Sequence, residues 1–425
     1  MANIAVIGTG YVGLTTGTVL AHLGHHVVCA DVIPDKVDAL SRGQIPILED
    51  GLDDLVREGI DGGRLSFVLG EAAAIEEADA EFVFLCVPTP QAEDGSADLS
   101  YIEQAARAIG PALRSESVVI NKSTVPVGST LVVERALGRG DVSVVSNPEF
   151  LREGSAVHDA LHPDRIVIGC EDQAAAIRVA SLYSEIKAPV IVTDPASAET
   201  IKYASNAFLA TKISFVNAIA NLCEAVGADV RDVVVGMGYD RRIGFEFLKP
   251  GPGWGGSCFP KDSRALVRIA EDNGYDFSLL QGVIEVNDEQ FERMAAKVER
   301  MVPGGLDGAV VGVWGLTFKA RTDDTRDSPS LQVIRRLQDK GARIKAYDPA
   351  ASVVPDSVER VADPYAAGEG AEVVVVLTEW DEFRWVDFEK LAGVMATPRV
   401  VDCRNLLDPA AVRRKGFQFE GLGRP

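Results

Sequence analysis

Cys258 is the residue of this sequence whose surroundings best suit covalent chemistry. It lies within residues 247–262, where four glycines and three prolines exclude a continuous helix or a paired central strand, so this stretch forms a loop. Residues 260–262 are typical of the first turn of a helix that continues over 263–273. A thiol at a helix N-terminus and close to the Lys261 ammonium is biased towards thiolate, the nucleophilic form. The loop is therefore a candidate for nucleophilic catalysis.

The alternative is that Cys258 is an inert thiol, because cysteines outside disulfides are usually small buried hydrophobic residues. The chain contains six cysteines and no CxxC pair. This spacing indicates a reducing compartment and predicts no metal site. The six are Cys29, Cys86, Cys170, Cys223, Cys258 and Cys403.

A glycine-rich turn near residue 10 has the pattern of a dinucleotide-binding site. An apolar strand over 3–7 precedes GxGxxG, an amphipathic segment over 11–23 and a second strand over 26–30 that ends at an acidic residue. The glycines allow the close approach of a pyrophosphate, the helix N-terminus supplies N–H donors, and the acidic residue accepts from the ribose hydroxyls. Since a carboxylate repels a 2′-phosphate, we predict NAD rather than NADP; the alternative is a turn that binds no ligand. The residues concerned are Gly8, Gly10, Tyr11, Val12, Gly13 and Asp31.

Strands and helices then alternate. This alternation predicts a mostly parallel, doubly wound sheet, whose ligands bind at the carboxyl ends of the strands. The further strands are predicted over 65–69, 81–86, 118–121, 142–145, 165–169 and 190–193, and helices over 101–113, 129–137 and 173–186. Polar turns follow the strand ends, and their side chains are candidates for the nicotinamide end of the cleft, although each alone is more often an ordinary turn residue. These candidates are Thr89, Thr124, Glu149 and Glu153.

Residues 196–227 predict one long helix, because no glycine or proline interrupts them before Gly227 and apolar residues recur at helical spacing. About thirty helical residues span ~45 Å, so this helix connects two domains or packs against a symmetry mate. Lys202 and Asn206 lie four apart on one face of it. Aimed at a cleft, they would stabilise a developing oxyanion; the alternative for Lys202 is an ordinary exposed lysine.

A second α/β pattern follows a boundary at 303–305. Strands are predicted over 309–315, 343–347, 373–377 and 400–402, with a helix over 330–340. The fold class is therefore α/β, with two Rossmann-like doubly wound domains joined by a long central helix in a helical middle domain. The predicted domains are 1–195 for NAD binding, 196–302 for the central helices with the cysteine loop, and 303–425 for the second sheet.

Composition limits the partners. The chain has 42 basic and 63 acidic residues, a net charge of −21, which argues against nucleic acid and against an anionic membrane surface. A hydrophobic content of 47% and a charged content of 25% are typical of a soluble globular protein. No basic n-region opens the sequence, and the longest aliphatic run is residues 373–377. We expect no signal peptide, no membrane span and a cytoplasmic protein.

Taken together in this order, the motifs closely resemble the UDP-glucose 6-dehydrogenase family of NAD-dependent nucleotide-sugar dehydrogenases, over essentially the whole chain. The motifs that carry the resemblance are residues 8–13, 122–128 (KSTVPVG), 147–153 (NPEFLRE), 202–206 (KYASN), 255–262 (GGSCFPKD) and 318–326 (FKARTDDTR). The resemblance implies oxidation of the sugar C6 alcohol to a carboxylate by two hydride transfers to two NAD⁺, without release of the aldehyde.

The resemblance also implies residue roles. Cys258 would attack the aldehyde to form a thiohemiacetal, whose oxidation gives a thioester that water cleaves. Lys202 and Asn206 would stabilise the alkoxide and oxyanions, Asp262 and Thr124 would place the water, and Glu149 is a candidate proton acceptor. Further residues implied to contact NAD are Lys36, Thr124, Glu153, Lys261 and Arg326. Those implied to bind the sugar nucleotide are Phe150, Leu151, Arg152, Glu153, Lys202, Asn206, Phe247, Leu248, Lys249, Pro250, Gly251, Gly255 and Lys319.

The family resemblance implies a homodimer built on the central helix, a C-terminal UDP-sugar-binding domain, and a residue contributed by the partner, for which Arg242 is the candidate. Ser257 and Phe259 beside the cysteine favour UDP-glucose, while the proline-rich segment 249–253 leaves GDP-mannose or another nucleotide sugar open. Two rivals remain. A simple two-electron dehydrogenase needs neither Cys258 nor the second sheet, and a non-catalytic NAD-binding scaffold does not need the retained Cys258, Lys202 and Asp262.

Overall fold

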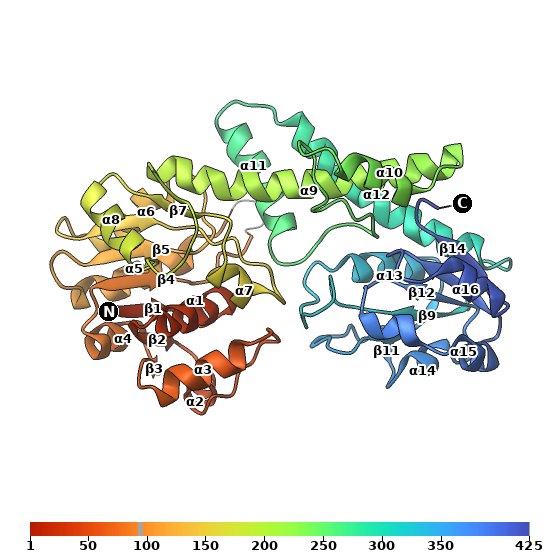
Figure 1. Ribbon diagram of the computed structural model, residues 1–425, viewed down its shortest axis with the longest axis horizontal. Helices are drawn as coiled ribbons and strands as arrows, with labels where there is room; N and C mark the ends of the chain where they lie inside the picture. Colours follow the sequence, from red (N-terminus) through yellow and green to blue (C-terminus); the bar gives the residue numbers. More distant parts are fainter. Residues whose placement is uncertain (92–96, 425) are drawn as a thin grey trace. The chain divides into compact units, whose positions relative to one another are not determined.

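The computed structural model describes residues 1–91 and 97–424, and the chain divides into two compact units. The first unit contains residues 1–205 and 264–273, and the second contains 206–263 and 274–425. Each unit is built on one sheet, which is mostly parallel in the first unit and parallel in the second (Figure 1). The predicted α/β class with two sheets and a long helix is therefore confirmed, whereas the predicted three-domain boundaries stay a prediction.

The first sheet has eight strands in the order β3-β2-β1-β4-β5-β6-β7-β8. From β1 the chain adds strands first on one side, up to β3, and then on the other side, up to β8. This order is the doubly wound arrangement that the sequence predicts. One pairing differs: β6 and β7 meet through a single antiparallel residue pair, Ser146 with Gly169, so β7 and β8 run against the other strands. The strands are β1 (Asn3–Ile7), β2 (His26–Asp31), β3 (Leu65–Leu69), β4 (Phe82–Leu85), β5 (Val118–Asn121), β6 (Ser143–Ser146), β7 (Ile166–Gly169) and β8 (Val190–Thr193).

Helices cover both faces of this sheet, so its central strands are apolar on both sides. In β1, Ile4 and Val6 enter one core and Ala5 and Ile7 enter the other. The first core is closed by α1 (Tyr11–His22), α2 (Pro34–Ser41), α3 (Leu52–Asp61), α7 (Ala156–Leu161) and α8 (Gln173–Ser181). The second is closed by α4 (Glu71–Ala78), α5 (Ser100–Ile109) and α6 (Ser129–Leu137). The helix predicted over 101–113 ends at Ile109, because Pro111 cannot donate the next hydrogen bond.

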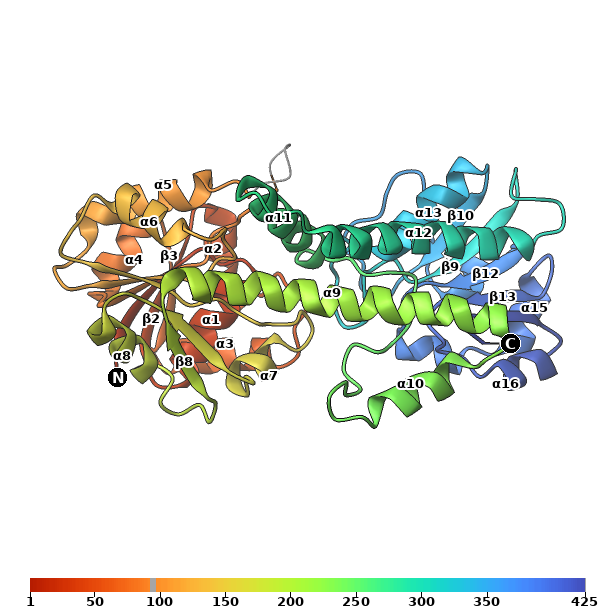
Figure 2. The same ribbon diagram turned by 90° about the horizontal axis from the view of Figure 1, so that it is seen from above.

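The long helix α9 (Pro195–Val226) is continuous over 32 residues, as the sequence predicts (Figure 2). Among the described helices it alone is long and apolar enough to cross a membrane by length and composition. Its buried polar residues are nevertheless bonded to protein, because Ser214 donates to Val283 O and Asn217 accepts from Gly251 N. The absence of a membrane span stays a prediction. The other middle helices are α10 (Val230–Gly238), α11 (Phe259–Asp272) and α12 (Ser278–Arg300).

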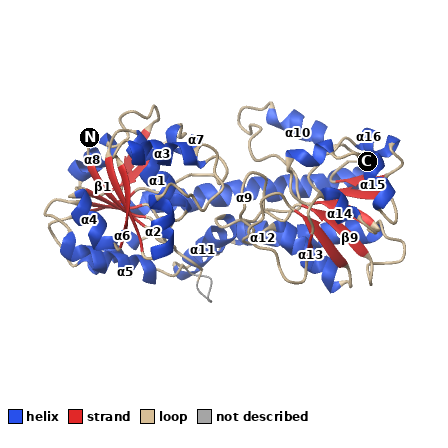
Figure 3. Ribbon diagram, turned by 90° about the horizontal axis from the view of Figure 1, so that it is seen from below, coloured by secondary structure: helices blue, strands red, loops and turns tan. Residues whose placement is uncertain are grey.

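The second sheet has six parallel strands in the order β11-β10-β9-β12-β13-β14. Figure 3 shows this sheet around the label β9. Its strands are β9 (Val310–Trp314), β10 (Arg343–Tyr347), β11 (Glu359–Arg360), β12 (Val373–Val376), β13 (Arg399–Asp402) and β14 (Gln418–Gly421). Its helices are α13 (Pro329–Asp339), α14 (Pro364–Gly368), α15 (Phe388–Val394) and α16 (Pro409–Arg414). The sequence predictions omit both edge strands, because short strands at a sheet edge carry little apolar periodicity.

Candidate active site

The turn between β1 and α1 has the shape that a pyrophosphate needs. Gly8 has a φ of +95°, and a Cβ at Gly13 would lie 1.9 Å from Gly8 O, so neither position accepts a side chain. At Gly10 a Cβ would meet no atom within 4 Å, so the space in front of the turn is open. No side chain caps α1 at Gly10, which leaves its N–H groups and positive end for an anion. The predicted NAD turn therefore fits its ligand.

Asp31 ends β2 beside this turn. Its Oδ2 accepts from Thr9 N at 3.1 Å, Thr9 Oγ1 at 2.5 Å and Lys36 Nζ at 2.7 Å. Burial raises the pKa of Asp31, but the hydrogen bonds from Lys36 and Thr9 outweigh it and hold that pKa below its usual value. The carboxylate is thus ionised and fixed next to the glycine turn, where the ribose hydroxyls of NAD are expected.

We expect Asp31→Ala to weaken NAD binding about tenfold or more, because hydrogen bonds to a charged group contribute ~1.5–3 kcal/mol. The variant also leaves the Lys36 ammonium available to a 2′-phosphate. The preference for NAD over NADP, measured as the ratio of their dissociation constants, should therefore become smaller. Calorimetric titration with each dinucleotide measures this ratio. In Asp31→Ala/Lys36→Met the improved binding of NADP should disappear. An unchanged ratio of the two dissociation constants in Asp31→Ala would mean that Asp31 has only a structural role at the end of β2.

Tyr11, predicted to contact the cofactor, is held by a carboxylate that the sequence analysis missed. Its hydroxyl donates to Glu49 Oε2, which also accepts from Gly154 N at 2.7 Å. Glu49 comes from the loop after α2, and Gly154 closes the segment that carries Glu149 and Glu153. Burial of Glu49 raises its pKa, although its backbone hydrogen bonds act in the opposite direction. Glu49 therefore connects the dinucleotide turn, through Tyr11, to the segment that carries Glu149 and Glu153, through Gly154.

Lys202 and Glu149 form a buried ion pair. Lys202 Nζ lies 2.7 Å from Glu149 Oε1 and 2.7 Å from the backbone oxygen of the same residue, and the two side chains are 4% and 5% exposed. Burial raises the pKa of Glu149, but the charge and hydrogen bond of Lys202 outweigh it and keep that pKa below its usual value. The alternative of an ordinary exposed lysine is excluded. The structure joins two predicted catalytic groups that are 53 residues apart in the chain.

The segment after Glu149 is ordered by further contacts. The Phe150 ring lies 3.5 Å from the Arg165 guanidinium and 5.5 Å from Lys202 Nζ. Leu151 N donates to Glu149 Oε2 at 2.6 Å. The sequence analysis missed Arg165, whose charge and flat guanidinium support the Phe150 ring from outside the predicted motif.

Thr124 and Thr89, both predicted near the nicotinamide, meet directly. Thr89 Oγ1 donates to the Thr124 backbone oxygen at 2.8 Å. The hydroxyl that the sequence assigns to the cofactor therefore also fixes the turn after β5. Ser123 Oγ donates to Val87 O at 2.8 Å and fixes the same turn from its other side.

Glu199 fixes the start of α6, the helix that follows the Thr124 turn. It is 2% exposed, and its carboxylate accepts from Gly128 N at 2.6 Å, Thr130 N at 3.0 Å and Thr130 Oγ1 at 2.8 Å. Uncapped N–H groups and the positive end of a helix favour a carboxylate in this position. The sequence analysis missed Glu199, although its spacing of three from Lys202 places both on one side of α9.

In the second unit, the glycines of the cysteine loop are required by close packing. A Cβ at Gly255 would lie 2.0 Å from Asp327 O. Gly256 has a φ of +80°, and a Cβ there would lie 2.9 Å from the Phe318 ring. The loop therefore rests directly on the segment that links β9 to α13, and larger residues would push it away.

Buried amide side chains hold the same loop in place. Asn287 of α12 accepts from Trp254 N at 2.8 Å and donates to Trp254 O at 3.0 Å. Asn217 of α9 and Gln290 of α12 bind the N–H and C=O of Gly251 in the same way, at 2.8 and 2.9 Å. The sequence analysis missed these three residues. They could have been found as polar residues at helix positions that face the core, because a buried amide needs hydrogen-bond partners there.

Cys258 occupies the N-cap position of α11, because its backbone oxygen accepts from Asp262 N at 2.9 Å. Its sulfur lies 3.6 Å from Ser257 Oγ. Cys258 is partly exposed, whereas the other five cysteines are buried. The predicted position at a helix N-terminus is confirmed.

Asp262, 1% exposed, is bound by two of the predicted residues. Asn206 Nδ2 donates to its Oδ2 at 2.6 Å, and Lys261 Nζ lies 2.7 Å from its Oδ1. Because Asn206 and Asp262 belong to different elements, α9 and the first turn of α11 are joined at this point. Asn206 and Asp262 therefore share one polar cluster at the first turn of the helix that Cys258 caps.

The remaining predicted residues vary in exposure. Phe247 has a φ of +61°, Leu248 is buried and Lys249 is exposed. Val12 packs against the first core, and Arg152 pairs with Asp159 at 2.6 Å. Partial exposure is found at Pro250, Gly255, Glu153 and Lys319, while Gly251 is buried.

Two predicted arginines form local ion pairs. Arg326 pairs with Asp324 at 2.8 Å, and Arg242 pairs with Asp240 at 2.6 Å.

The N–H groups in the first turn of the second sheet are less available to an anion than those in the first sheet. Gly315 N donates to Tyr347 O just as Gly8 N donates to Ala30 O, each at 2.8 Å. Here, however, Asp348 Oδ2 accepts from Leu316 N at 2.7 Å and Thr317 N at 3.0 Å. The turn's donors are already occupied by a carboxylate, so a nucleotide bound to this sheet must use other groups.

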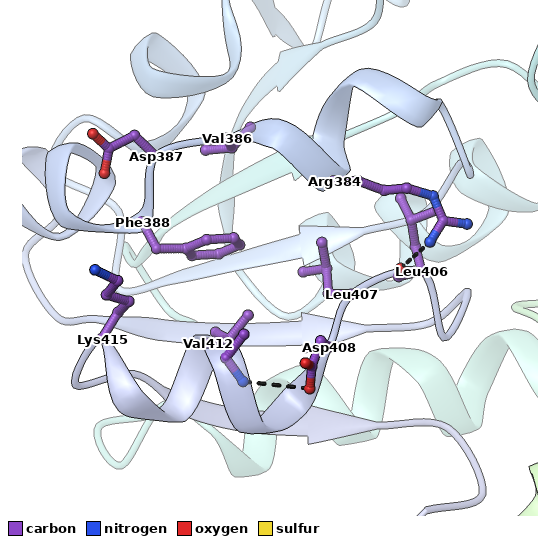
Figure 4. Close-up of a pocket in the computed structure, with 10 residues that line it drawn as sticks. Arg384, Val386, Asp387, Phe388, Leu406, Leu407, Asp408, Val412 and Lys415 are labelled. Carbon is purple, nitrogen blue, oxygen red and sulfur yellow. Dashed lines mark hydrogen bonds between the residues drawn. The ribbon is translucent and has the colours of Figure 1, made fainter.

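One hollow of about 350 Å³ lies in the second unit (Figure 4). It is bordered by Phe388, Leu406 and Lys415, and Arg384 beside it donates to Leu406 O at 2.7 Å. It contains none of the predicted site residues. Across the described parts of the chain, no group of three or more His, Cys, Asp or Glu side chains is arranged to hold a metal ion.

Three family models match the chain in succession. The NAD binding domain of the UDP-glucose/GDP-mannose dehydrogenase family matches residues 2–187, its central domain matches 196–289, and its UDP binding domain matches 312–409.

Individual proteins match over the full chain. UDP-glucose 6-dehydrogenase TuaD of Bacillus subtilis is 45% identical, with 100% of this chain and 94% of the relative covered. UDP-glucose 6-dehydrogenase of Rhizobium meliloti is 46% identical, with 100% of both covered. The structure of a UDP-glucose dehydrogenase from Pyrobaculum islandicum has a TM-score of 0.92 at 41% identity, covering 100% and 98%. That of a UDP-D-ManNAc dehydrogenase from Pyrococcus horikoshii has a TM-score of 0.88 at 28% identity, covering 99% of each.

Proposed function

Because the chain belongs to the UDP-glucose/GDP-mannose dehydrogenase family, we propose that it oxidises UDP-glucose at C6 to UDP-glucuronate, with NAD⁺ as the hydride acceptor. The observation that carries the proposal is Cys258, the partly exposed cysteine at the N-cap of α11 among five buried ones. UDP-glucose is favoured over other nucleotide sugars because the three UDP-glucose dehydrogenases described above are 41–46% identical, against 28% for the UDP-D-ManNAc enzyme.

The proposed reaction passes through an aldehyde, a thiohemiacetal and a thioester. The C6 alcohol loses a proton and a hydride to become an aldehyde, and the Cys258 thiolate adds to its carbonyl carbon to form a thiohemiacetal. Loss of a second hydride from the alkoxide form of this thiohemiacetal gives a thioester, and water then breaks the C–S bond to release the carboxylate, the thiol and a proton. NAD⁺, when bound, accepts both hydrides, one per molecule. One sugar therefore consumes two NAD⁺ and one water.

The polar residues supply the remaining chemistry. Lys202 and Asn206 donate to the alkoxide and to the tetrahedral oxyanions, where preorganised donors lower the barrier most. Thr124 and Asp262 orient the water, and Glu149 accepts a proton. Support comes from the contacts within each unit, since Lys202 already binds Glu149 and Asn206 already binds Asp262.

The second sheet domain is proposed to hold the uridine diphosphate, in line with the UDP binding model that it matches. Its first turn is closed by Asp348, so the cations outside that turn are the available phosphate ligands. We assign this role to Lys319. Arg404 is fixed nearby, because it donates to Phe318 O at 3.0 Å and to Leu377 O at 2.8 Å.

The test is NADH formation with a panel of UDP-glucose, GDP-mannose and UDP-N-acetylmannosamine. We expect UDP-glucose to give the highest kcat/KM and two NADH per sugar. One NADH per sugar would instead favour a simple two-electron dehydrogenase. No NADH with any of the three would favour a non-catalytic NAD-binding scaffold.

We also propose a cytoplasmic homodimer. The six cysteines are thiols rather than disulfides, as in a reducing compartment. Phe208, Phe215 and Leu222 lie seven residues apart along α9 and are 64%, 51% and 55% exposed. An apolar line of this kind on a helix is typical of a helix–helix interface, and a two-fold axis would place it against its own copy.

Phe215→Glu is expected to weaken this dimer. Phe215 is the middle residue of the apolar line, and truncating a central interface residue costs about 2 kcal/mol or more, roughly thirtyfold in Kd. Light scattering over a dilution series measures the shift from dimer to monomer. Ile177→Glu, which changes an exposed apolar residue of α8 instead, should leave the Kd unchanged. Equal Kd values for Phe215→Glu and the unmodified chain would place the interface elsewhere.

A further inference from the structure

Lys122 is a cation that the proposed mechanism does not use. It directly follows β5, and its Nζ donates to Asn147 Oδ1 at 3.0 Å and lies 5.8 Å from the centroid of the Tyr183 ring. Within residues 1–91 and 97–424, the hydrogen-bond partner of this ammonium is thus a neutral amide and not a carboxylate. Lys122 is partly buried, and a partly desolvated charge without a direct counter-ion is costly, so its retention needs an explanation.

The charges that face Lys122 belong to the candidate active site. The titratable groups around it are Cys86 after β4, Glu149 after β6, Tyr183 after α8 and Lys202 on α9. Burial raises the pKa of Cys86 to about 12 and also raises that of Tyr183, so both are neutral at neutral pH. The charged neighbours are therefore the Glu149–Lys202 pair. Burial lowers the pKa of Lys122 itself to about 8, against the charge of Glu149, which raises it.

Asn147 connects Lys122 to Glu149 through the backbone, because it lies two residues before Glu149. Its Oδ1 accepts from Lys122 and from Tyr183 Oη, the latter at 2.7 Å, and its Nδ2 donates to Val167 O at 2.7 Å. Three partners thus fix this side chain at the base of the segment that carries Glu149. Lys122 acts on Glu149 both through this contact and through its charge.

We propose that Lys122 is a positioning residue that holds Asn147 and supplies a second positive charge, which keeps Glu149 ionised while Lys202 serves the substrate oxyanion. The inference rests on the proposed function, because Lys202 has two tasks there. It neutralises Glu149 in this structure and donates to the oxyanion during the reaction. With Lys122 present, the three groups carry one net positive charge, which matches one developing negative charge.

The test is the pH dependence of kcat in Lys122→Met. Without the second charge Glu149 binds its proton more tightly, so we expect the acid limb of the profile to move up by about one pH unit. At neutral pH Glu149 stays ionised in both proteins, so kcat should fall less there than on the acid limb, through the lost contact with Asn147 alone. The ionisation of Lys122 near pH 8 should disappear from the alkaline side, while the KM for NAD⁺ stays unchanged. Lys122→Arg keeps the charge and should keep the acid limb.

Tyr183→Phe is the matched control, because it removes the other donor to Asn147 without changing a charge. It should lower kcat modestly and leave the acid limb in place. If Lys122→Met does not fold, Lys122→Gln replaces it, because glutamine keeps an N–H donor for Asn147 and removes the charge. The same shift of the acid limb is expected in it.

An acid limb in Lys122→Met or Lys122→Gln that coincides with that of the unmodified enzyme overturns the inference. A shift of equal size in Tyr183→Phe overturns the assignment to charge. Glu149→Gln separates these results from the proposed function: the acid limb should vanish in it, and a limb that persists would show that Glu149 is not the proton acceptor.

Discussion

Cys258→Ser should abolish the formation of two NADH per sugar, with kcat reduced on the order of 10³-fold or more, as for loss of other catalytic nucleophiles. A serine hydroxyl remains protonated at neutral pH, and an ester of the sugar acid would not form through it at a useful rate. The first oxidation does not require the thiol in the proposed sequence. The variant should therefore stop after at most one NADH per active site, which a burst experiment with UDP-glucose and excess NAD⁺ measures.

Cys170→Ala is a suitable control for Cys258→Ser, because Cys170 is a buried thiol at the end of β7 in the first unit. It should produce two NADH per sugar at an unchanged rate. Full four-electron turnover by Cys258→Ser would remove the covalent step, and the aldehyde hydrate would then be the remaining route to the acid.

Lys202→Met should reduce kcat about 10²–10³-fold, as expected for loss of one oxyanion donor. It should also destabilise the protein by about 3–5 kcal/mol, because Glu149 is left as a buried charge without its partner. Urea unfolding measures the free energy of unfolding, and the slope with urea shows whether the unfolded states are comparable.

The loss of stability in Lys202→Met should depend on pH. In the unmodified chain the pKa of Glu149 is below its usual value, so the ion pair stabilises the fold at neutral pH and this stabilisation is lost as the pH falls through that pKa. In Lys202→Met the pKa of Glu149 should be higher than in the unmodified chain, because burial is then opposed only by the Leu151 hydrogen bond and the charge of Lys122. The penalty is therefore present at neutral pH and is relieved on acidification. The difference in unfolding free energy between the two proteins should therefore shrink from pH 7 towards pH 4.

Lys202→Met/Glu149→Gln separates stability from catalysis. Replacing both charges by neutral side chains should recover most of the lost stability, because no buried carboxylate is left without Lys202. It should not recover turnover. If the double variant is as unstable as the single one, the ion pair is not the source of the loss; if the single variant turns over normally, Lys202 is only structural.

Much of the fold is predictable because it rests on local patterns. Central parallel strands read as continuous apolar runs, and β1 and β5 have the predicted bounds. The edge strands β3 and β8 also have the predicted bounds. The long helix α9 was identifiable from an uninterrupted helical period. The antiparallel contact of β6 with β7 was not, because a strand's apolar pattern is the same in either direction. The family resemblance, drawn from motifs in order, is confirmed by three domain matches.

The candidate site was only partly predictable. Motif spacing identified Lys202, Glu149, Asn206, Asp262 and Cys258, but it did not indicate which of them pair. It also missed Glu49, Glu199 and Asn287, whose roles depend on backbone groups far away in the chain, such as Gly154, Thr130 and Trp254. A polar residue on a helix looks the same in the sequence whether it faces water or a buried amide group.

By itself, the sequence determined the chemistry that is available: a glycine turn for a pyrophosphate, a carboxylate at the end of β2, and a cysteine before a helix. These depend on residues within about 25 positions of one another, and steric and hydrogen-bonding rules act at that range. Only the tertiary structure decided the charge state and partner of each group. Burial and counter-ions set both, and they come from segments that the chain brings together only when it folds.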